Sequence, residues 1–360
     1  MQSLRVGIVG TGFTGRVHAE AAIRQRSRVV AVAGSTPAAA ARAITGWMVD
    51  ARALSADALV SDPEVDVVHL CVPNHLHHRL AMAAMANGKH VVCEKPLATN
   101  PEDAAALADA ADRHGVVGAV PFVYRYHPMA HEARELVRSG ELGPVHLIHG
   151  SYLQDWLSEP SDQNWRVSPA QGGASRAFGD IGSHWCDLAE WVTGHRITGL
   201  TATTQTVYPT RPTQSGTAEP VTTEDVAVAA LRTDRGAVGA VVVSQVSPGR
   251  KNRLLLEASG PRGTVTFDQE DPERLWLGRR SHSTTMLRDP ATLSPGAARV
   301  NTLPAGHALG YHDCFSAFLA DVGAAVRGGD VPDSLPTFRD GARAVAITDD
   351  VLRSAAAAAW

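Results

Sequence analysis

The sequence predicts an α/β domain with a parallel, doubly wound sheet, followed by an α+β domain with an open, mainly antiparallel sheet. Its 360 residues are too many for one hydrophobic core and suit two domains. Up to about Pro121, short β-branched runs alternate with alanine-rich helical stretches. Beyond that point, short strands separated by turns dominate. We therefore expect domains over residues 1–121 and 122–360.

The first domain is expected to repeat strand–helix units. Alternation of this kind indicates parallel strands joined by right-handed crossovers. Helical stretches are expected over Val17–Gln25, after Pro37, and over Pro101–His114. The expected strands are Arg5–Val9, Arg28–Ala33, Val65–Val72, His90–Cys93 and Val116–Pro121.

The second domain is expected to be built on antiparallel strands, because turn residues such as Asp234–Gly236 separate most of its apolar runs. The segment Pro209–Pro220, rich in Pro, Thr and Ser, is expected to be a surface loop. Helices are expected over Asp180–Thr193, Tyr311–Arg327 and Thr337–Ala356. The expected strands are Val145–Leu153, Leu200–Val207, Val226–Arg232, Ala237–Ser244, Arg253–Ala258, Thr264–Asp268 and Leu275–Leu277.

Composition excludes several classes of protein. With 44% hydrophobic and 19% charged residues, the chain is an ordinary globular one. The net charge is -4 and no basic block interleaves with aromatic residues, so we expect no nucleic-acid partner. No apolar run approaches the roughly 20 residues of a membrane span, and no targeting segment is recognised, so we expect a cytoplasmic protein.

Cysteine and histidine spacing argues against a metal site. No pair of the four cysteines has metal-ligand spacing, and we expect reduced, packed thiols. His75, His77 and His78 lie close together in the sequence, but adjacent side chains point in different directions and no carboxylate or cysteine accompanies them. We expect no bound metal.

A glycine-rich loop follows the first strand. Gly10-Thr11-Gly12-Phe13-Thr14-Gly15 has the pattern Gly-x-Gly-x-x-Gly between a strand and a helix. In such a loop Gly10 permits a tight turn, Gly12 lets the backbone approach a pyrophosphate, and Gly15 lets the helix pack closely. The context predicts a Rossmann dinucleotide site that includes Phe13 and Thr14.

The end of the second strand bears on the choice of cofactor. It reads Ala33-Gly34-Ser35-Thr36, without the carboxylate that usually binds the adenosine ribose. Without that charge a 2′-phosphate is not repelled, and the Ser35 and Thr36 hydroxyls could donate to it, although the nearest arginine is Arg42. NADP or NAD remains possible, with a lean toward NADP.

Three further segments carry polar residues that suit redox chemistry. The residues Val72-Pro73-Asn74 and His77 follow one buried strand, and Glu94-Lys95-Pro96 follow the next. Ligands bind at such carboxyl ends in open α/β sheets. Farther on, Asp180 and His184 stand four residues apart, on one face of an expected helix.

In these segments the sequence resembles the Gfo/Idh/MocA family, which includes glucose–fructose oxidoreductase and inositol dehydrogenase. The glycine loop, Pro-Asn-x-x-His, Glu-Lys-Pro and Asp-x-x-x-His appear in family order. The resemblance implies that Lys95 and His184 are catalytic, with Asp180 near the substrate. It further implies a cofactor site lined by Val72, Pro73, Asn74, His77, Glu94, Lys95 and Pro96. More loosely, it implies substrate or cofactor contacts at Tyr124, Arg125, Trp165 and Arg166.

Elementary chemistry agrees with these roles. Oxidation of a secondary alcohol needs a base for the hydroxyl proton, and an imidazole such as His184 suits that role. The ammonium of Lys95 could stabilise the developing alkoxide. Each residue also has a structural explanation, since Asp180 could cap a helix, His184 could be a core histidine, and Lys95 a solvated loop residue.

The family resemblance leaves three kinds of function open. The first is a dehydrogenase or reductase acting on a sugar, glycoside or cyclitol. The second is a glycoside-cleaving enzyme that oxidises its substrate transiently with nicotinamide. The third is a non-catalytic dinucleotide-binding sensor, which would have no need for both Lys95 and His184. An open-faced sheet usually needs cover, so we also expect a homo-oligomer, either a dimer or a tetramer.

Overall fold

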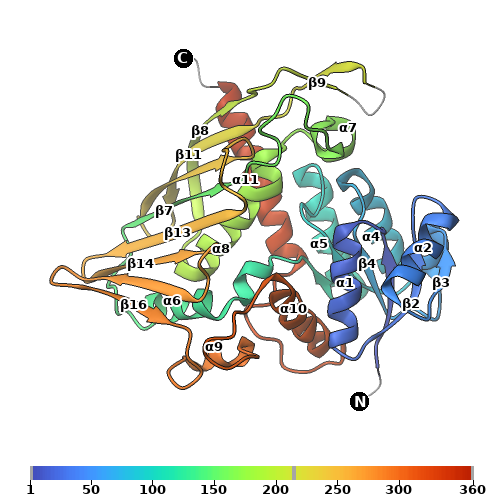
Figure 1. Cartoon of the computed structure of the whole chain (residues 1–360), viewed down its shortest axis with the longest axis horizontal. Helices are drawn as coiled ribbons and strands as arrows, with labels where there is room; N and C mark the ends of the chain where they lie inside the picture. Colours follow the sequence, from blue (N-terminus) through green and yellow to red (C-terminus); the bar gives the residue numbers. More distant parts are fainter. Residues whose placement is uncertain (1–2, 213–215, 358–360) are drawn as a thin grey trace. The chain divides into compact units, whose positions relative to one another are not determined.

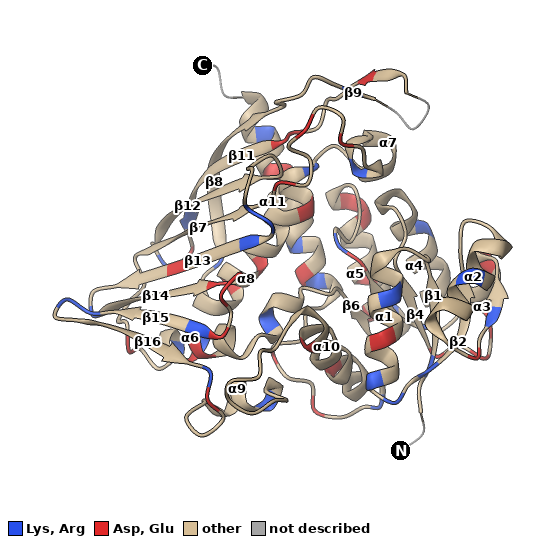
Figure 2. Ribbon diagram, in the orientation of Figure 1, with Lys and Arg blue, Asp and Glu red and all other residues tan. Residues whose placement is uncertain are grey.

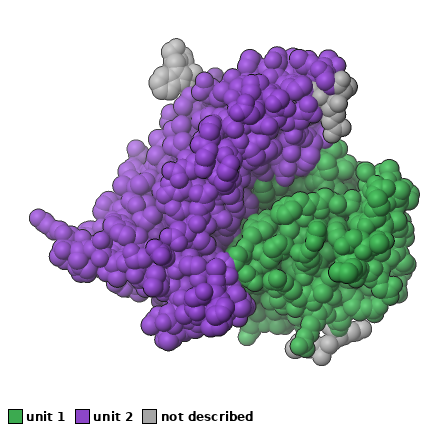
Figure 3. All heavy atoms as spheres, viewed as in Figure 1, with its two compact units in different colours: residues 1–123, 310–345 green, residues 124–309, 346–360 purple. Residues whose placement is uncertain are grey.

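The structure, a computed structural model, describes residues 3–212 and 216–357. The chain forms two compact units (Figure 3). The first consists of Met1–Val123 and Gly310–Val345, and the second of Tyr124–Leu309 and Ala346–Trp360. Residues 310–345 were expected in the second domain but belong to the first unit. The reason is that helix α10 (Tyr311–Val326) packs against α1 (Phe13–Arg24). Phe315 and Phe318 supply the apolar contact face of α10 and are fully buried.

The first unit contains the predicted parallel sheet. Its six strands lie in the order β3-β2-β1-β4-β5-β6, and every pair is parallel. The strands β2 and β3 are added on one side of β1, and β4 to β6 are added on its other side. Ligands of open α/β sheets bind at the carboxyl ends of the strands where the strand order changes side in this way, here between β1 and β4. The strands are β1 (Arg5–Val9), β2 (Arg28–Ala33), β3 (Arg52–Leu54), β4 (Val67–Leu70), β5 (His90–Cys93) and β6 (Gly118–Ala119).

Helices cover both faces of this sheet (Figure 1). Helix α5 (Pro101–His114) illustrates why they form. The Asn100 side chain accepts a hydrogen bond from the N–H of Asp103, Pro101 occupies the first turn, and Gly115 ends the helix in a left-handed conformation. Leu107 on its inner face belongs to the core cluster that packs on the sheet. The other helices between strands are α2 (Pro37–Trp47), α3 (Ala56–Ser61) and α4 (His77–Ala86).

The second unit is built on an eight-stranded sheet in the order β16-β15-β14-β13-β7-β12-β11-β8. All neighbours are antiparallel except β7 and β12, which run parallel. The strands are β7 (Leu147–Leu153), β8 (Ile197–Gln205), β11 (Val226–Thr233), β12 (Val238–Ser244), β13 (Arg253–Gly260), β14 (Gly263–Asp268), β15 (Arg274–Gly278) and β16 (Ser283–Leu287).

Helices lie on one face of this sheet. Helix α6 (Pro128–Arg138) packs on β14, and α8 (Ser183–Thr193) packs on β13 (Figure 1). Burial alternates along β11, so one row of side chains points to these helices and the other is exposed. The remaining α-helices among the described residues are α7 (Pro169–Gly172), α9 (Pro295–Val300) and α11 (Phe338–Ala357).

The structure differs from the expected loop and from the expected start of one helix in the second unit. Part of the predicted loop Pro209–Pro220 is a hairpin, in which β9 (Thr210–Pro212) pairs with β10 (Ala218–Pro220), and residues 213–215 lie outside the described residues. Asp180 does not cap α8, because a π-helical turn (Phe178–Gly182) precedes the helix and Asp180 lies inside it. Gly194, by contrast, ends α8 in the expected left-handed conformation.

Charged side chains of both signs are interspersed over the ribbon, without a long block of one sign (Figure 2). In the described part of the chain, no helix is both long and apolar enough to cross a membrane.

Candidate functional site

The glycine loop joins β1 to α1 and packs against the end of β4. Gly10 has φ +114°, and a Cβ there would lie 2.0 Å from the carbonyl oxygen of Cys71. A Cβ on Gly15 would lie 2.1 Å from the carbonyl oxygen of Gly10. Only glycine fits at these two positions, because both contacts are with backbone atoms.

Gly12 plays a different part, because a Cβ at this position would meet nothing within 4 Å. Helix α1 begins at Phe13 with no side-chain cap and no acidic residue in its first turn. The first N–H groups of α1 therefore have no side-chain acceptor, and the space beside Gly12 is open. A pyrophosphate needs both features in order to bind at a helix N-terminus. Thr14 is half-buried, while Phe13 is 71% exposed and stacks on Tyr311 at 6.5 Å between ring centroids. The loop thus fits a dinucleotide.

The turn after β2 offers hydroxyls and no carboxylate. Ser35 and Thr36 are exposed, and the Thr36 hydroxyl caps α2 by accepting a hydrogen bond from Ala39. A Cβ on Gly34 would lie 2.9 Å from the backbone nitrogen of Ala40. A side chain at position 34 would therefore require the start of α2 to move.

His77 connects the loops that follow β4 and β5. Its ring is fully buried, with Nδ1 2.8 Å from the carbonyl oxygen of Pro96 and Nε2 3.0 Å from that of Val72. Burial lowers the pKa of His77, and the two carbonyl contacts oppose that effect. Because both nitrogens face protein carbonyls, we assign His77 to positioning these loops rather than to the direct cofactor contact implied by the resemblance.

Other residues at the same edge remain accessible to different degrees. Val72 and Pro73 are half-buried, and Asn74 is buried in the turn that leads into α4. Lys95 and Pro96 are half-buried after β5, and the bond between them is a cis peptide.

Glu94 points into the interior of the first unit. Its carboxylate accepts hydrogen bonds from the backbone N–H of Lys95 at 3.1 Å and from the ring of His18 at 3.2 Å. Burial alone would raise the pKa of Glu94, but these hydrogen bonds and the nearby positive charge of Lys95 together lower it. Glu94 is therefore an internal carboxylate, and a direct cofactor contact is not the role that its position suggests.

His184 lies in the second unit, in the first turn of α8, among aromatic side chains. The ring of Tyr124 meets it edge-on at 5.1 Å, and that of Tyr152 lies 6.3 Å away. The two tyrosine hydroxyl oxygens are 2.7 Å apart. The His184 side chain is largely buried.

A ring of hydrogen bonds extends from these tyrosines. Tyr152 donates to Asn252 Oδ1 at 2.8 Å, and Asn252 Nδ2 donates to the Tyr124 hydroxyl at 3.0 Å. Gln154 donates to the same Asn252 oxygen at 2.7 Å and accepts from the indole of Trp156. Sequence reasoning missed Tyr152, Gln154, Trp156 and Asn252, because only the pairing of β7 with β13 brings them together.

Asp180 is held by two partners in the second unit. Arg166 Nε lies 3.3 Å from one carboxylate oxygen, and Gln245 Nε2 donates to the other at 2.8 Å. Arg166 also lies over the ring of Trp165, at 4.4 Å from its centroid. The structure thus brings together three sequence-predicted residues, and the π-helical turn sets the position of Asp180. Such turns occur frequently at functional sites.

Arg125 does not have the surroundings of a substrate-binding residue. Its guanidinium forms a buried two-pronged ion pair with Asp187, with Nε 2.8 Å from Oδ2. A buried pair of this kind holds the 3-10 turn before α6 to α8, so we assign Arg125 a structural role.

The predicted site residues are divided between the two units. The first unit gathers the glycine loop, the ends of β4 and β5, and Lys95; the second gathers His184, Asp180, Trp165 and Arg166. No group of three or more His, Cys, Asp or Glu residues suited to a metal ion occurs among the described residues.

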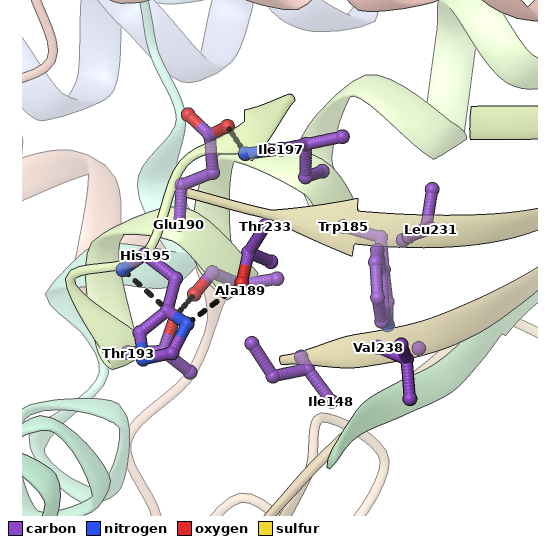
Figure 4. A pocket seen from close by; sticks show the side chains of 11 residues that line it. Ile148, Trp185, Ala189, Glu190, Thr193, His195, Ile197, Leu231, Thr233 and Val238 are labelled. Carbon is purple, nitrogen blue, oxygen red and sulfur yellow. Dashed lines mark hydrogen bonds between the residues drawn. The ribbon is translucent and has the colours of Figure 1, made fainter. Parts of the chain in front are cut away.

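A separate pocket lies at the other end of α8, and its geometry is structural. His195 Nδ1 lies 3.0 Å from the Thr233 hydroxyl, and Glu190 accepts the backbone N–H of Ile197 (Figure 4). These contacts satisfy the polar groups, and the remaining lining is apolar, with Trp185, Leu231 and Ile148. We find no chemistry-bearing cluster there.

Comparison with known proteins covers the whole chain. Residues 4–122 match the oxidoreductase family with an NAD-binding Rossmann fold (GFO/IDH/MocA), and residues 130–266 match the GFO/IDH/MocA C-terminal domain. Levoglucosan dehydrogenase from Pseudarthrobacter phenanthrenivorans is 31% identical over 100% of this chain and 98% of its own length. Inositol 2-dehydrogenase 2 from Saccharopolyspora erythraea is 29% identical over 74% of this chain and 73% of its own.

Solved structures of similar proteins have the same fold as this chain. A levoglucosan dehydrogenase in complex with NADH and L-sorbose aligns with a TM-score of 0.92 at 31% identity, over 99% of this chain and 97% of that one.

Proposed function

The chain is an NAD-binding oxidoreductase of the GFO/IDH/MocA family that acts on CH–OH groups, and we propose that its substrate is a secondary hydroxyl, or the matching ketone, of a sugar, glycoside or cyclitol. The full-length similarity to a levoglucosan dehydrogenase is the observation that carries this proposal. The hydrogen-bond ring beside His184 supports it, because a polyol needs several donors and acceptors at fixed positions.

The proposed roles of the residues follow from their chemistry. A bound nicotinamide supplies the hydride acceptor. His184 takes the proton of the reacting hydroxyl, since an imidazole titrates near neutral pH. The ammonium of Lys95 donates a hydrogen bond to the same oxygen and stabilises its developing negative charge. Asp180 and Arg166 bind neighbouring hydroxyls of the substrate, with Trp165 beside them.

The turn after β2 bears on the choice of cofactor. Ser35 and Thr36 expose two hydroxyls and no carboxylate, so the turn neither repels a 2′-phosphate nor offers a charged acceptor to the ribose of NAD. We propose that the chain accepts both cofactors and favours NADP by a small factor.

The exposed face of the second sheet supports a homo-oligomer. Val228 on β11 lies opposite Val242 on β12, and both are 38% exposed. Val238 and Trp276 are also exposed, at 51% and 41%. Apolar side chains exposed on the face of a sheet favour burial against another protein surface, and a second copy of the chain would supply one. Light scattering on the purified protein tests this, and a monomer at micromolar concentration would contradict it.

A substrate screen tests the proposed function. The purified chain is incubated with anhydrosugars, free sugars, glycosides and cyclitols in the presence of each oxidised cofactor, and absorbance of the reduced nicotinamide is followed. Reduction with at least one of these polyols is expected. Glycoside cleavage without net cofactor reduction would favour the glycoside-cleaving alternative, and cofactor binding without turnover of any compound would favour a sensor.

A further inference from the structure

A chain of three buried polar side chains leads to Lys95 in the first unit. His18 and His69 are 0% and 2% exposed, and Glu94 is 8% exposed. The Nδ1 atoms of the two histidines are 3.1 Å apart, and His18 Nε2 lies 3.2 Å from Glu94 Oε1. The other oxygen of Glu94 accepts the backbone N–H of Lys95 at 3.1 Å.

The direction of these hydrogen bonds follows from what each group can do. An ionised carboxylate only accepts, so His18 Nε2 donates to Glu94. The Nδ1 atoms of His18 and His69 share a second hydrogen bond. Burial lowers the pKa of His69 well below its ordinary value, which keeps that ring neutral. The hydrogen bonds therefore link His69, His18 and Glu94 in one continuous series.

The three side chains come from separate elements of a largely apolar core. His18 lies on α1, the helix that follows the glycine loop, His69 lies within β4, and Glu94 follows β5. The ring of Phe315 on α10 meets His18 edge-on at 5.0 Å and closes the cluster. Polar groups in such a core are costly unless they are fully hydrogen-bonded, and apolar residues would fill these positions more stably. Their presence points to a purpose other than stability.

We propose that His18 and His69 are positioning residues for the reaction. They fix the carboxylate of Glu94, which holds the main chain at Lys95 and thereby the place of the Lys95 ammonium. This inference rests on the proposed role of Lys95. If His18 is lost, the buried carboxylate lacks a donor and turns toward another one, which releases the N–H of Lys95. Misplacement of a reacting group by about 1 Å can slow an enzyme by roughly a hundredfold.

Substitutions of His18 by the two amides test the proposal. Glutamine reaches as far as Nε2 and can still donate to Glu94, whereas asparagine reaches only as far as Nδ1 and can contact only His69. We expect His18→Asn to lower kcat about tenfold or more, and His18→Gln to retain most of the wild-type kcat. The affinity for NAD, measured by calorimetry, should stay within about threefold in both, because the glycine loop is unchanged.

A stability control separates positioning from loss of folding. Leu107 on α5 is fully buried in the same unit, and Leu107→Ala creates a cavity there. At a temperature well below every melting transition, this variant should keep the wild-type kcat. If Leu107→Ala lowers kcat as much as His18→Asn does at a similar melting temperature, or if His18→Gln is as slow as His18→Asn, the proposal is overturned.

The Lys95→Ala background distinguishes this proposal from the proposed function. His18→Asn should cost little further activity there, because it acts through Lys95. Wild-type turnover in Lys95→Ala alone would refute the role of Lys95. If Lys95→Ala is slow but His18→Asn is fully active, only the positioning role of His18 and His69 is refuted. The same conclusion holds if the two effects on kcat multiply in the double variant.

Discussion

His77 Nδ1 lies 2.8 Å from the carbonyl oxygen of Pro96, so a histidine at the start of α4 contacts the residue directly after Lys95. The other ring nitrogen faces the carbonyl of Val72 at the end of β4. One buried side chain thus joins the two loops at the carboxyl edge of the parallel sheet. It fixes the spacing of two segments that sequence reasoning assigned to the cofactor.

The first prediction concerns this contact. His77→Ala removes the one hydrogen bond that the neutral ring donates to a loop carbonyl and the packing of the buried ring, which should lower the free energy of unfolding by about 2–4 kcal/mol. Affinity for the dinucleotide should fall as well, because the loops are no longer held together. Chemical denaturation and calorimetry measure the two effects. His78→Ala, a half-buried neighbour on the same helix, serves as the control, and equal losses in both variants would contradict the assignment.

The glycine loop allows a paired experiment. Gly12→Val enters open space, so the melting temperature should stay close to wild type while affinity for NAD is lost, because the valine occupies the place of the pyrophosphate. Gly15→Val meets the backbone of Gly10 and should destabilise the fold by about 1–3 kcal/mol. Calorimetry and thermal unfolding check both variants. Full NAD affinity in a folded Gly12→Val protein would refute this location of the site.

The choice of cofactor can be tested next to Gly34 rather than at it. An aspartate at position 34 would collide with the backbone of Ala40, so its effect would mix binding with a shift of α2. Ser35 is exposed, and Ser35→Asp should lower kcat/KM for NADP about tenfold or more through repulsion of the 2′-phosphate. Ser35→Asn serves as the uncharged control. If the wild-type enzyme already strongly prefers NAD in steady-state kinetics, the proposed lean toward NADP is wrong.

The catalytic pair makes a kinetic prediction. His184→Ala should lower kcat roughly a hundredfold, with partial recovery of the oxidation at high pH, where hydroxide replaces the base. Lys95→Ala should lower kcat by a similar order without recovery at high pH. Because both groups act on one oxygen, the double variant should lose less than the product of the two effects. Wild-type turnover in either alanine variant would end the assignment of that residue.

The last prediction concerns stability in acid. Burial lowers the pKa of His131 to about 3, helped by Arg299, Arg134 and His127, whereas an exposed histidine titrates near 6.5. The neutral ring is therefore favourable above pH 6.5, and its contribution is lost as the pH falls toward 3. Between pH 6 and 5, the wild-type protein should lose about 1.4 kcal/mol of unfolding free energy per pH unit through His131. His131→Phe should not show this loss. Urea unfolding at the two pH values measures it, with the exposed His114→Gln as control. Equal pH dependence in His131→Phe and wild type would contradict it.

Much of the fold could be predicted from local patterns. The period of the apolar residues predicted most strands of both sheets but neither β3 nor β16, and turn residues such as Gly194 marked where helices end. The hairpin of β9 and β10 was missed because a segment rich in Pro and Thr has no apolar face, and pairing alone makes its strands. The return of α10 to the first unit was missed because the order of elements in a chain does not say which core a helix joins.

The sequence alone determined the glycine loop, the residues after β4 and β5, and the candidates Lys95, Asp180 and His184, because each depends on residue type and spacing within a short segment. Tertiary structure decided which neighbours these residues have. It buried Arg125 against Asp187, bound Asp180 to Gln245, and placed His18 and His69 behind Glu94. The partners in these four contacts lie between 51 and 76 residues apart in the sequence. No local pattern encodes such pairs, because hydrogen bonds between distant segments depend on the register and packing of whole elements.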